Sequence, residues 1–360
     1  MGPRPEIDAL KVYSPGTSLE DAARVAGHDR LIKLASNESL WGPSQKALEA
    51  AQQALLSIQY YPAMQLSSLI AALAKTHQLA PDTLVVGNGA DEILRLIATV
   101  YSEPGTSIVY PYPSFSAYHH SARLAGATPR PIRLGPKGEN DLEAILEAVD
   151  STTRVIYLCT PNNPTGGMIS RDAWDAFLLA IPKTVVVVVD GAYQEFVEDE
   201  EAPDFLQAVR QGHPVVVVRT FSKLYALAGL RIGWAAAPPA VIIALNKARE
   251  PFSLNAIGAH AATASLGDLE YFDWVRQQTL EARAHFIKLL GSRSIKHFPT
   301  QANFVTLKSP DDDRVTAERL LQQGFVVRPT TSFGLPGYLR VTVAPIPIMD
   351  KFMMEWDRMQ

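Results

Sequence analysis

The sequence is nearly free of cysteine, since Cys159 is the only one among 360 residues. A single thiol cannot form an internal disulfide or a cluster of thiolate metal ligands. Cys159 also follows the apolar residues Val155 to Leu158, which favours a buried structural thiol over a reactive one. We therefore expect a protein of a reducing compartment, without a metal site.

Long apolar runs and blocks of one charge sign are also missing. No apolar run reaches the roughly 18 residues of a membrane-spanning helix, and no apolar signal core follows Met1. The chain has 33 lysines and arginines against 37 aspartates and glutamates, a formal net charge of −4, spread along its length. This pattern predicts no basic surface for nucleic acid or membranes. We expect a cytoplasmic protein with small-molecule partners.

The composition, with 47% hydrophobic and 19% charged residues, is that of a globular protein. A length of 360 residues suggests about two domains of roughly 150 residues each. The valine runs Val185–Val189 and Val215–Val218 show no polar alternation, which is typical of parallel strands covered on both faces. The predicted strands of this type are Thr83–Gly87, Ser107–Tyr110, Arg154–Cys159, Thr184–Asp190, Pro214–Thr220 and Arg231–Ala236.

Amphipathic segments such as Ala90–Tyr101 separate these runs and predict crossover helices, hence an α/β fold with a mostly parallel sheet. After about Pro251 the pattern changes to a smaller α+β domain. We expect residues 36–253 to form the large domain, and residues 1–35 plus 254–360 to form an N-terminal arm and the small domain. The elements predicted there are a short strand at Leu31–Ala35, a long helical stretch near Asn255–Leu290, and strands at Asn303–Leu307, Phe325–Arg328 and Tyr338–Val343.

Polar residues follow several predicted strands, at the sheet edge where open α/β folds bind ligands. The glycine turn Gly87–Glu92 leads into a helix whose first N–H groups could hold a phosphate, or it is a plain tight turn. Glu92 stands where a dinucleotide fingerprint needs its third glycine, which disfavours a nicotinamide dehydrogenase. The turn Pro161–Gly166 is either structural or offers the amides of two asparagines to a ligand.

Two further strand ends carry ionisable groups. Asp190 ends a run of five valines, either as a helix cap or as the counter-ion of a buried cationic ligand. Lys223 follows the next strand, where a desolvated amine could act as a nucleophile. Thr220, Ser222 and Arg231 around it could bind a phosphate dianion. Because all these groups are expected at one sheet edge, a ligand site is favoured over a solvated lysine.

These residues resemble the histidinol-phosphate aminotransferase family, pyridoxal-phosphate enzymes of the aspartate-aminotransferase-like fold (fold type I). The resemblance runs over nearly the whole chain. The motifs that carry it are Tyr13-Ser-Pro-Gly, Leu34-Ala-Ser-Asn-Glu, Tyr61-Pro, Gly89-Ala-Asp-Glu, Pro113-Ser-Phe, Pro161-Asn-Asn-Pro-Thr-Gly, Asp190-x-x-Tyr, Thr220-x-Ser-Lys-x-x-x-Leu-Ala-Gly-Leu-Arg, Val327-Arg-Pro and Leu339-Arg-Val-Thr.

The resemblance implies a three-layer α/β/α enzyme and assigns roles around pyridoxal 5'-phosphate. Lys223 would be the Schiff-base lysine and proton carrier, and Asp190 would keep the pyridine nitrogen protonated. Asn163 and Tyr193 would hydrogen-bond the ring 3-oxygen, and Phe115 would stack on the ring. The phosphate would be held by Ala90, Asp91, Thr220, Ser222 and Arg231, with Tyr61 reaching it from the neighbouring subunit of a homodimer with shared active sites.

Substrate contacts follow from the same resemblance. Arg340 would clamp a carboxylate, Arg328 and Tyr13 would contact the distal phosphate or side chain, and Asn37 and Asn303 lie in matching segments, either as contacts or as turn residues. The implied reaction is transamination from histidinol phosphate to 2-oxoglutarate, as in histidine biosynthesis. An aromatic amino-acid aminotransferase, or a lyase similar to threonine-phosphate decarboxylases, stays open. A cofactor-binding regulator is disfavoured because Lys223 is retained and no DNA-binding extension is recognisable.

Three departures from the family pattern bear on the substrate. The usual Asn-Glu-Asn-Pro is replaced by the sequence from Asn37 to Trp41, and a bulky Trp41 could alter the side-chain pocket. Gly191 replaces the usual glutamate after Asp190, and the residues from Ala344 onward replace Gly-Thr. None of these changes touches the implied cofactor residues.

Overall fold

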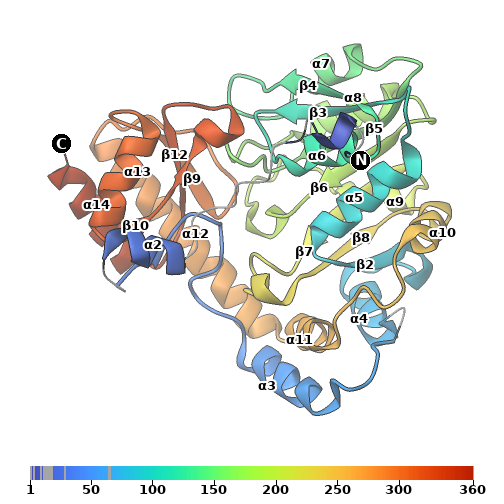
Figure 1. Cartoon of the computed structure of the whole chain (residues 1–360), viewed down its shortest axis with the longest axis horizontal. Coiled ribbons are helices and arrows are strands. Elements are labelled where there is room, and N and C mark those ends of the chain that lie inside the picture. Colours follow the sequence, from blue (N-terminus) through green and yellow to red (C-terminus); the bar gives the residue numbers. More distant parts are fainter. Residues whose placement is uncertain are drawn as a thin grey trace.

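The computed structural model describes residues 2, 5–8, 10, 19–27, 30–63 and 66–359. The larger part of the molecule is built on a seven-stranded sheet (Figure 1). β8 runs antiparallel to both of its neighbours, β2 and β7, and every other neighbouring pair is parallel. The strands in spatial order are β2 (Leu84–Asn88), β8 (Ile232–Ala236), β7 (Val215–Thr220), β6 (Val186–Asp190), β5 (Thr153–Cys159), β3 (Ser107–Tyr112) and β4 (Thr128–Arg133).

All six strands predicted for the large sheet are confirmed. β4 was not predicted, because its sequence from Thr128 to Arg133 contains two prolines, which remove ladder donors and are tolerated at a sheet edge. The valine runs behave as expected of strands buried on both faces. Val187, Val189 and Val217 belong to one core cluster, whereas the alternate residues Val186 and Val188 belong to another.

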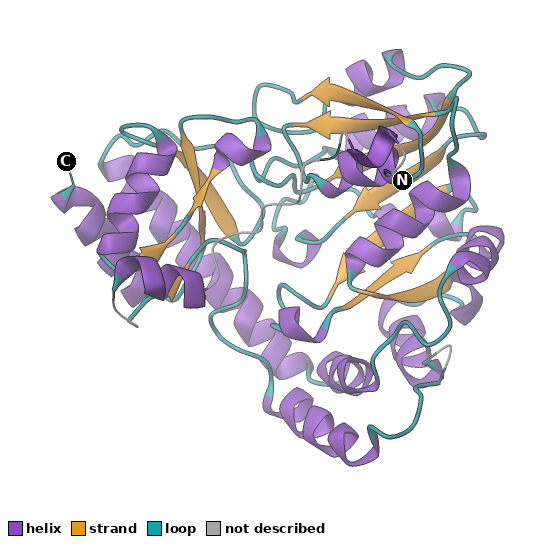
Figure 2. Ribbon diagram, in the orientation of Figure 1, coloured by secondary structure: helices purple, strands orange, loops and turns teal. Residues whose placement is uncertain are grey.

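Helices cover both faces of this sheet and complete three layers (Figure 2). The core cluster that contains Val187 and Val189 includes residues of α4 (Ser67–His77), α7 (Leu142–Glu147), α8 (Arg171–Ala180), α9 (Phe205–Arg210) and α11 (Ala256–Leu266). The cluster that contains Val186 and Val188 includes residues of α5 (Ala90–Tyr101), α6 (Ala117–Leu124) and α10 (Pro239–Ala248).

The smaller part, orange and red on the left of Figure 1, holds an antiparallel three-stranded sheet. Its strands are β11 (Arg328–Pro329), β12 (Tyr338–Thr342) and β9 (Phe304–Lys308). β1 (Ile32–Lys33) pairs in parallel with β10 (Phe325–Val326), which confirms a strand near residue 32 and divides the predicted strand 325–328 in two. The helices of this part are α2 (Leu19–Ala26), α12 (Leu269–Ser292), α13 (Asp313–Gln322) and α14 (Ile346–Arg358).

The helical stretch predicted from Asn255 to Leu290 is not one helix but two. α11 ends at Leu266 with Gly267 as its C-cap, and α12 starts after Asp268, whose carboxylate accepts a hydrogen bond from Lys46 at 2.7 Å. Residues of α11 pack with the core of the large sheet, although they follow the predicted domain boundary near residue 254. The boundary itself stays a prediction. The remaining helices are α1 (Pro5–Asp8), α3 (Gln45–Ala54) and the 3-10 turns η1 (Leu55–Ser57), η2 (Pro81–Thr83), η3 (Gln194–Phe196), η4 (Ala228–Leu230) and η5 (Thr330–Phe333).

Within the described ranges, no helix combines the length and the apolar character that crossing a membrane requires.

Candidate active site

A cavity of about 400 Å³ lies at the carboxyl edge of the large sheet, where β11, β12 and residues 35–38 of the smaller part close over it. The strand ends that carry the polar motifs meet there, as predicted. The predicted residues that line it are Asn37, Ala90, Asp91, Phe115, Asn163, Asp190, Tyr193, Thr220, Ser222, Lys223, Arg231, Arg328 and Arg340.

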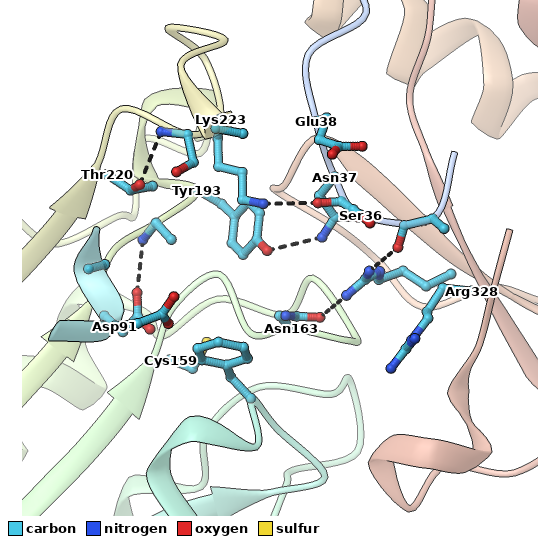
Figure 3. Close-up of a pocket in the computed structure, with 18 of the residues that line it drawn as sticks. Ser36, Asn37, Glu38, Asp91, Cys159, Asn163, Tyr193, Thr220, Lys223 and Arg328 are labelled. Atoms are coloured by element: carbon cyan, nitrogen blue, oxygen red, sulfur yellow. Dashed lines mark hydrogen bonds between the residues drawn. The ribbon is translucent and has the colours of Figure 1, made fainter. Parts of the chain in front are cut away.

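Lys223 follows β7 and points across the cavity toward residues 36–38 (Figure 3). Its Nζ donates a hydrogen bond to the carbonyl oxygen of Ser36 at 3.0 Å and lies 5.7 Å from the centroid of the Tyr193 ring. Burial, together with the positive charge of Arg340, lowers the pKa of Lys223 to about 8. A larger fraction of this amine is therefore neutral at pH 7 to 8 than of an ordinary lysine, which suits a nucleophile and proton carrier.

Asp190 is the last residue of β6 and is 4% exposed. Its Oδ2 accepts a hydrogen bond from the Tyr118 hydroxyl at 2.7 Å, and its Oδ1 accepts one from the amide of Ala192 at 3.2 Å. Burial raises the pKa of Asp190 to about 6, against the lowering effect of the Tyr118 hydrogen bond. A cationic group in the cavity would stabilise the ionised form, so this carboxylate fits the counter-ion interpretation.

Tyr118 is a member of the site that the sequence did not reveal. It lies on α6, is fully buried and stacks on Tyr157 with ring centroids 4.8 Å apart. The Tyr157 hydroxyl in turn donates to the carbonyl oxygen of Leu94 at 2.7 Å. The two stacked rings thus fix the Tyr118 hydroxyl that orients Asp190. Tyr118 and Asp190 are 72 positions apart, and no local sequence pattern around Tyr118 predicts their contact.

Tyr193 and Asn163 line the cavity and connect to the smaller part of the molecule through hydrogen bonds. The Tyr193 hydroxyl accepts a hydrogen bond from Asn37 Nδ2 at 3.0 Å, and burial raises the pKa of this phenol, which therefore keeps its proton. Asn163 Oδ1 accepts from Arg340 Nη1, while Arg340 Nη2 donates to the carbonyl oxygen of Ala35. Figure 3 shows the hydrogen bond between Asn37 and Tyr193 and the position of Asn163.

The first turn of α5 forms the other end of the cavity. Gly89 precedes the helix with φ 77° and supplies no side-chain cap, so the first amide groups of α5 stay available for an anion beside Ala90 and Asp91. A Cβ atom at Gly89 would lie 2.4 Å from Arg231 Nη2, and one at Gly233 would lie 2.4 Å from the amide nitrogen of Ala90. Only glycine allows these close approaches.

Side chains complete this cradle for an anion. Thr220 Oγ1 accepts from the amide of Ser222 at 3.0 Å, and Arg231 Nη1 lies 3.5 Å from Ser222 Oγ. Arg231 Nη2 also pairs with Asp91 Oδ2 at 3.0 Å. Helix amides, two hydroxyls and a guanidinium converge as a phosphate dianion requires.

The arrangement fits pyridoxal phosphate. The uncapped start of α5 suits the phosphate, the buried carboxylate of Asp190 suits a protonated ring nitrogen, and Lys223 supplies an amine for the aldehyde. Tyr193 and Asn163 can hydrogen-bond the ring oxygen. Residue by residue, these cofactor roles remain our proposal.

Two further predicted residues, Asn303 and Tyr61, are not among the residues that line the cavity. Asn303 is buried behind Asn37 and donates from Nδ2 to the Asn37 carbonyl oxygen at 3.1 Å, so it supports that segment. Tyr61 is 82% exposed and stacks on Phe252. Tyr13 lies outside the described residues. Trp41 packs with the cores around Phe304 and Phe352 and is not among the residues that line the cavity.

Cys159 is free and buried, as predicted, and it also lines the cavity. Burial and the nearby Asp190 raise the pKa of this thiol to about 12, so it stays protonated and unreactive at neutral pH. Two other lining residues, Glu38 and Phe333, were not assigned a role from the sequence.

Comparisons with known proteins show the family of the chain. A sequence profile of the family described as aminotransferase class I and II matches residues 29–350. A histidinol-phosphate aminotransferase of Moorella thermoacetica is 39% identical over 342 residues, covering 94% of this chain and 88% of that protein.

Two solved structures show the same fold. One is a histidinol-phosphate aminotransferase from Sinorhizobium meliloti in complex with pyridoxal-5'-phosphate, with a TM-score of 0.87, 28% identity, and coverage of 97% of this chain and 95% of that one. The other is a double mutant of Thermus thermophilus aspartate aminotransferase, with a TM-score of 0.86 and coverage of 100% of both chains. At 22% identity the second shows likeness of fold alone.

Proposed function

The chain belongs to the aminotransferase class I and II family and is a pyridoxal-phosphate-dependent aminotransferase, and on this premise we propose that it transfers the amino group of L-histidinol phosphate to 2-oxoglutarate. The observation that best supports this proposal is a pair of arginines in the cavity. Arg328 and Arg340 are direct partners across β11 and β12, and both line the cavity that holds Lys223 and Asp190. Like charges placed opposite each other are unfavourable unless an anion joins them.

Bound pyridoxal phosphate supplies an electron sink for the electron pair left on the donor's α-carbon when its proton departs. The protein's part is to handle that proton and to orient the donor. Lys223 Nζ, with its pKa lowered to about 8, can take up the proton and release it again without a large energetic penalty. Asp190 holds positive charge at the ring nitrogen, and Arg340 holds an anionic group of the donor.

One pocket must accept the amino donor and then the 2-oxo acid acceptor, because transamination moves the amino group from the first to the second. A phosphate and a carboxylate are both anions that a guanidinium fork binds through parallel hydrogen bonds. Arg340 is fixed by Asn163 and Ala35, and Arg328 beside it adds a second charge. Such a pair supports a phosphate-bearing donor that alternates in the pocket with the dicarboxylate acceptor 2-oxoglutarate.

The function is tested by comparing kcat/KM for L-histidinol phosphate, L-phenylalanine and L-glutamate as donors. We expect histidinol phosphate to be preferred over phenylalanine by at least tenfold. A preference for phenylalanine would instead make the protein an aromatic amino-acid aminotransferase. Release of carbon dioxide from a phosphorylated amino acid, without a 2-oxo acid acceptor, would make it a lyase.

Replacing Arg340 tests separately whether it holds the anionic group of the donor. We expect Arg340→Lys to lower kcat/KM for glutamate and for histidinol phosphate by about 100-fold, because an ammonium keeps the charge but loses the bidentate fork. The visible absorbance of the bound cofactor should stay, since Arg340 lies away from the start of α5. Arg319→Lys is the matched control, on an exposed arginine of α13 paired with Asp311. Unchanged kcat/KM in Arg340→Lys would move the clamp to another residue.

We also propose a homodimer with shared active sites. The segment after α3 carries a group of exposed apolar side chains, which on a single chain would be an unfavourable surface. They are Leu55, Leu56, Ile58, Tyr60 and Tyr61, and Phe252 stacks on Tyr61 with ring centroids 4.7 Å apart. The proposal puts Tyr61 of one chain at the phosphate of the other.

A cytoplasmic location remains a prediction from the sequence.

Light scattering on the holoprotein tests this proposal. We expect the mass of two chains, and we expect Leu56→Glu combined with Ile58→Glu to yield single chains that retain cofactor poorly. Leu179→Glu, at a leucine that is 89% exposed on α8, should change neither property. A native protein with the mass of one chain and full activity would contradict the shared site.

A further inference from the structure

The wall of the cavity nearest Arg328 and Arg340 contains an aromatic residue that none of the roles above includes. Phe333 ends η5, lines the cavity, and lies with its ring centroid 5.3 Å from the guanidinium carbon of each arginine. An aromatic face attracts cations at this distance. One ring therefore contacts both members of a pair of like charges.

The backbone that carries Phe333 is fixed from inside the smaller part. Asp313, which is fully buried at the start of α13, accepts hydrogen bonds from the amide of Thr331 at 2.8 Å and from its hydroxyl at 2.6 Å. Thr330, also fully buried, donates from Oγ1 to the carbonyl oxygens of Leu335 and Tyr338. Both oxygens of this buried carboxylate accept hydrogen bonds from Thr331, so Asp313 fixes the position of the η5 turn.

The other side of the turn meets the large part of the molecule. Gly334 has φ 86°, and a Cβ atom there would lie 1.9 Å from the Tyr112 hydroxyl at the end of β3. A side chain at residue 334 would be strained and would collide with Tyr112. η5 is thus held between α13 and the large sheet, with Phe333 directed at the two arginines.

We propose that Phe333 is a specificity-determining residue, whose ring sets the spacing of the Arg328 and Arg340 guanidiniums so that together they bind a phosphate monoester dianion. Asp313 and Thr331 are positioning residues that act through this ring. The inference rests on the proposed function, because it names the part of the donor that is selected. It explains why two arginines can stand opposite each other and remain separate enough to share one doubly charged group.

The first test compares Phe333→Leu with the wild-type holoenzyme. We expect the KM for L-histidinol phosphate to rise about tenfold while kcat changes less than twofold, and the KM for L-histidinol, which has no phosphate, to stay within twofold. Inorganic phosphate, as a competitive inhibitor of the glutamate half-reaction, should show a similar rise in its inhibition constant. Phe298→Leu is the control, because Phe298 packs on Tyr338 in the same part of the molecule.

The positioning residues are tested by a matched pair. Thr331→Val keeps the amide hydrogen bond to Asp313 but loses the hydroxyl one, and it should raise the KM for histidinol phosphate severalfold at unchanged kcat, whereas Thr331→Ser should behave as wild type. An unchanged KM and phosphate inhibition constant in Phe333→Leu, or equal losses with histidinol and histidinol phosphate, would overturn the proposal. If the wild type does not use histidinol phosphate, the proposed function fails, and the phosphate inhibition constants alone then decide the role of Phe333.

Discussion

Lys223→Ala should abolish transamination, with kcat at least about four orders of magnitude below wild type, because both the nucleophile and the proton carrier are lost. The fold should be retained, since the substitution removes one hydrogen bond to the Ser36 carbonyl oxygen at 3.0 Å and one ammonium contact 5.7 Å from the centroid of the Tyr193 ring. Borohydride reduction should fix the cofactor to the wild-type chain on the peptide that contains residue 223 and should fix none to the variant. Lys247→Ala, at an exposed lysine of α10, is the control.

The same lysine predicts a pH dependence. The pKa of Lys223 is lowered to about 8, so the fraction of neutral amine grows as the pH rises through this value. Uptake of pyridoxal phosphate by wild-type apoprotein should therefore accelerate between about pH 7 and 9, as followed by absorbance in a stopped-flow instrument. Substantial turnover by Lys223→Ala, or borohydride trapping at another lysine, would contradict the assigned role.

Asp190→Asn should lower kcat by about three orders of magnitude while the cofactor stays attached. The asparagine can still accept from Tyr118, but it has no charge to keep the ring nitrogen protonated. The readout is the single-turnover rate of α-proton loss from glutamate, measured with α-deuterated donor for comparison. Asp172→Asn, in the exposed first turn of α8, serves as control, and an unchanged rate in Asp190→Asn would exclude the role.

The buried carboxylate also predicts how stability depends on pH in the apoprotein. Folding raises the pKa of Asp190 from 3.8 to about 6, so its contribution to stability is complete below about pH 4 and is lost as the pH rises through 6. The Tm of the wild-type apoprotein should therefore fall relative to that of Asp190→Asn between pH 4 and 7. A constant difference in Tm across this range would show that the carboxylate is not buried as the structure indicates.

Local sequence patterns were sufficient for every strand of the large sheet except β4 and for the polar residues that follow the predicted strands. Five consecutive valines before Asp190 predict a strand buried on both faces, and parallel strands necessarily bring their carboxyl ends together. Glycines at 89 and 233 could be placed in turns and strands from the sequence. Both glycines allow the start of α5 to approach Arg231 and β8 closely, and this contact is visible only in the folded structure.

Contacts between distant segments could not be predicted. Tyr118 and Asp190 are 72 positions apart, and no periodicity links a residue of α6 to the end of β6. The sequence left Asn303 open between a substrate contact and a turn residue. Its position behind Asn37, next to β9, which pairs with β12 in the smaller core, follows from the fold. Phe333 lies in a turn whose position depends on Asp313, twenty residues earlier, so its place beside the arginines follows from packing alone.

The most direct test of the central claim is the visible absorption spectrum of the purified protein, reconstituted with pyridoxal phosphate, before and after addition of L-histidinol phosphate. We predict a yellow band that is lost on addition of the donor and restored by 2-oxoglutarate, because the amino group moves to the cofactor and then to the acceptor. A protein that shows no cofactor band after reconstitution, or a band that no amino donor bleaches, would contradict the assignment of this cavity as an aminotransferase active site.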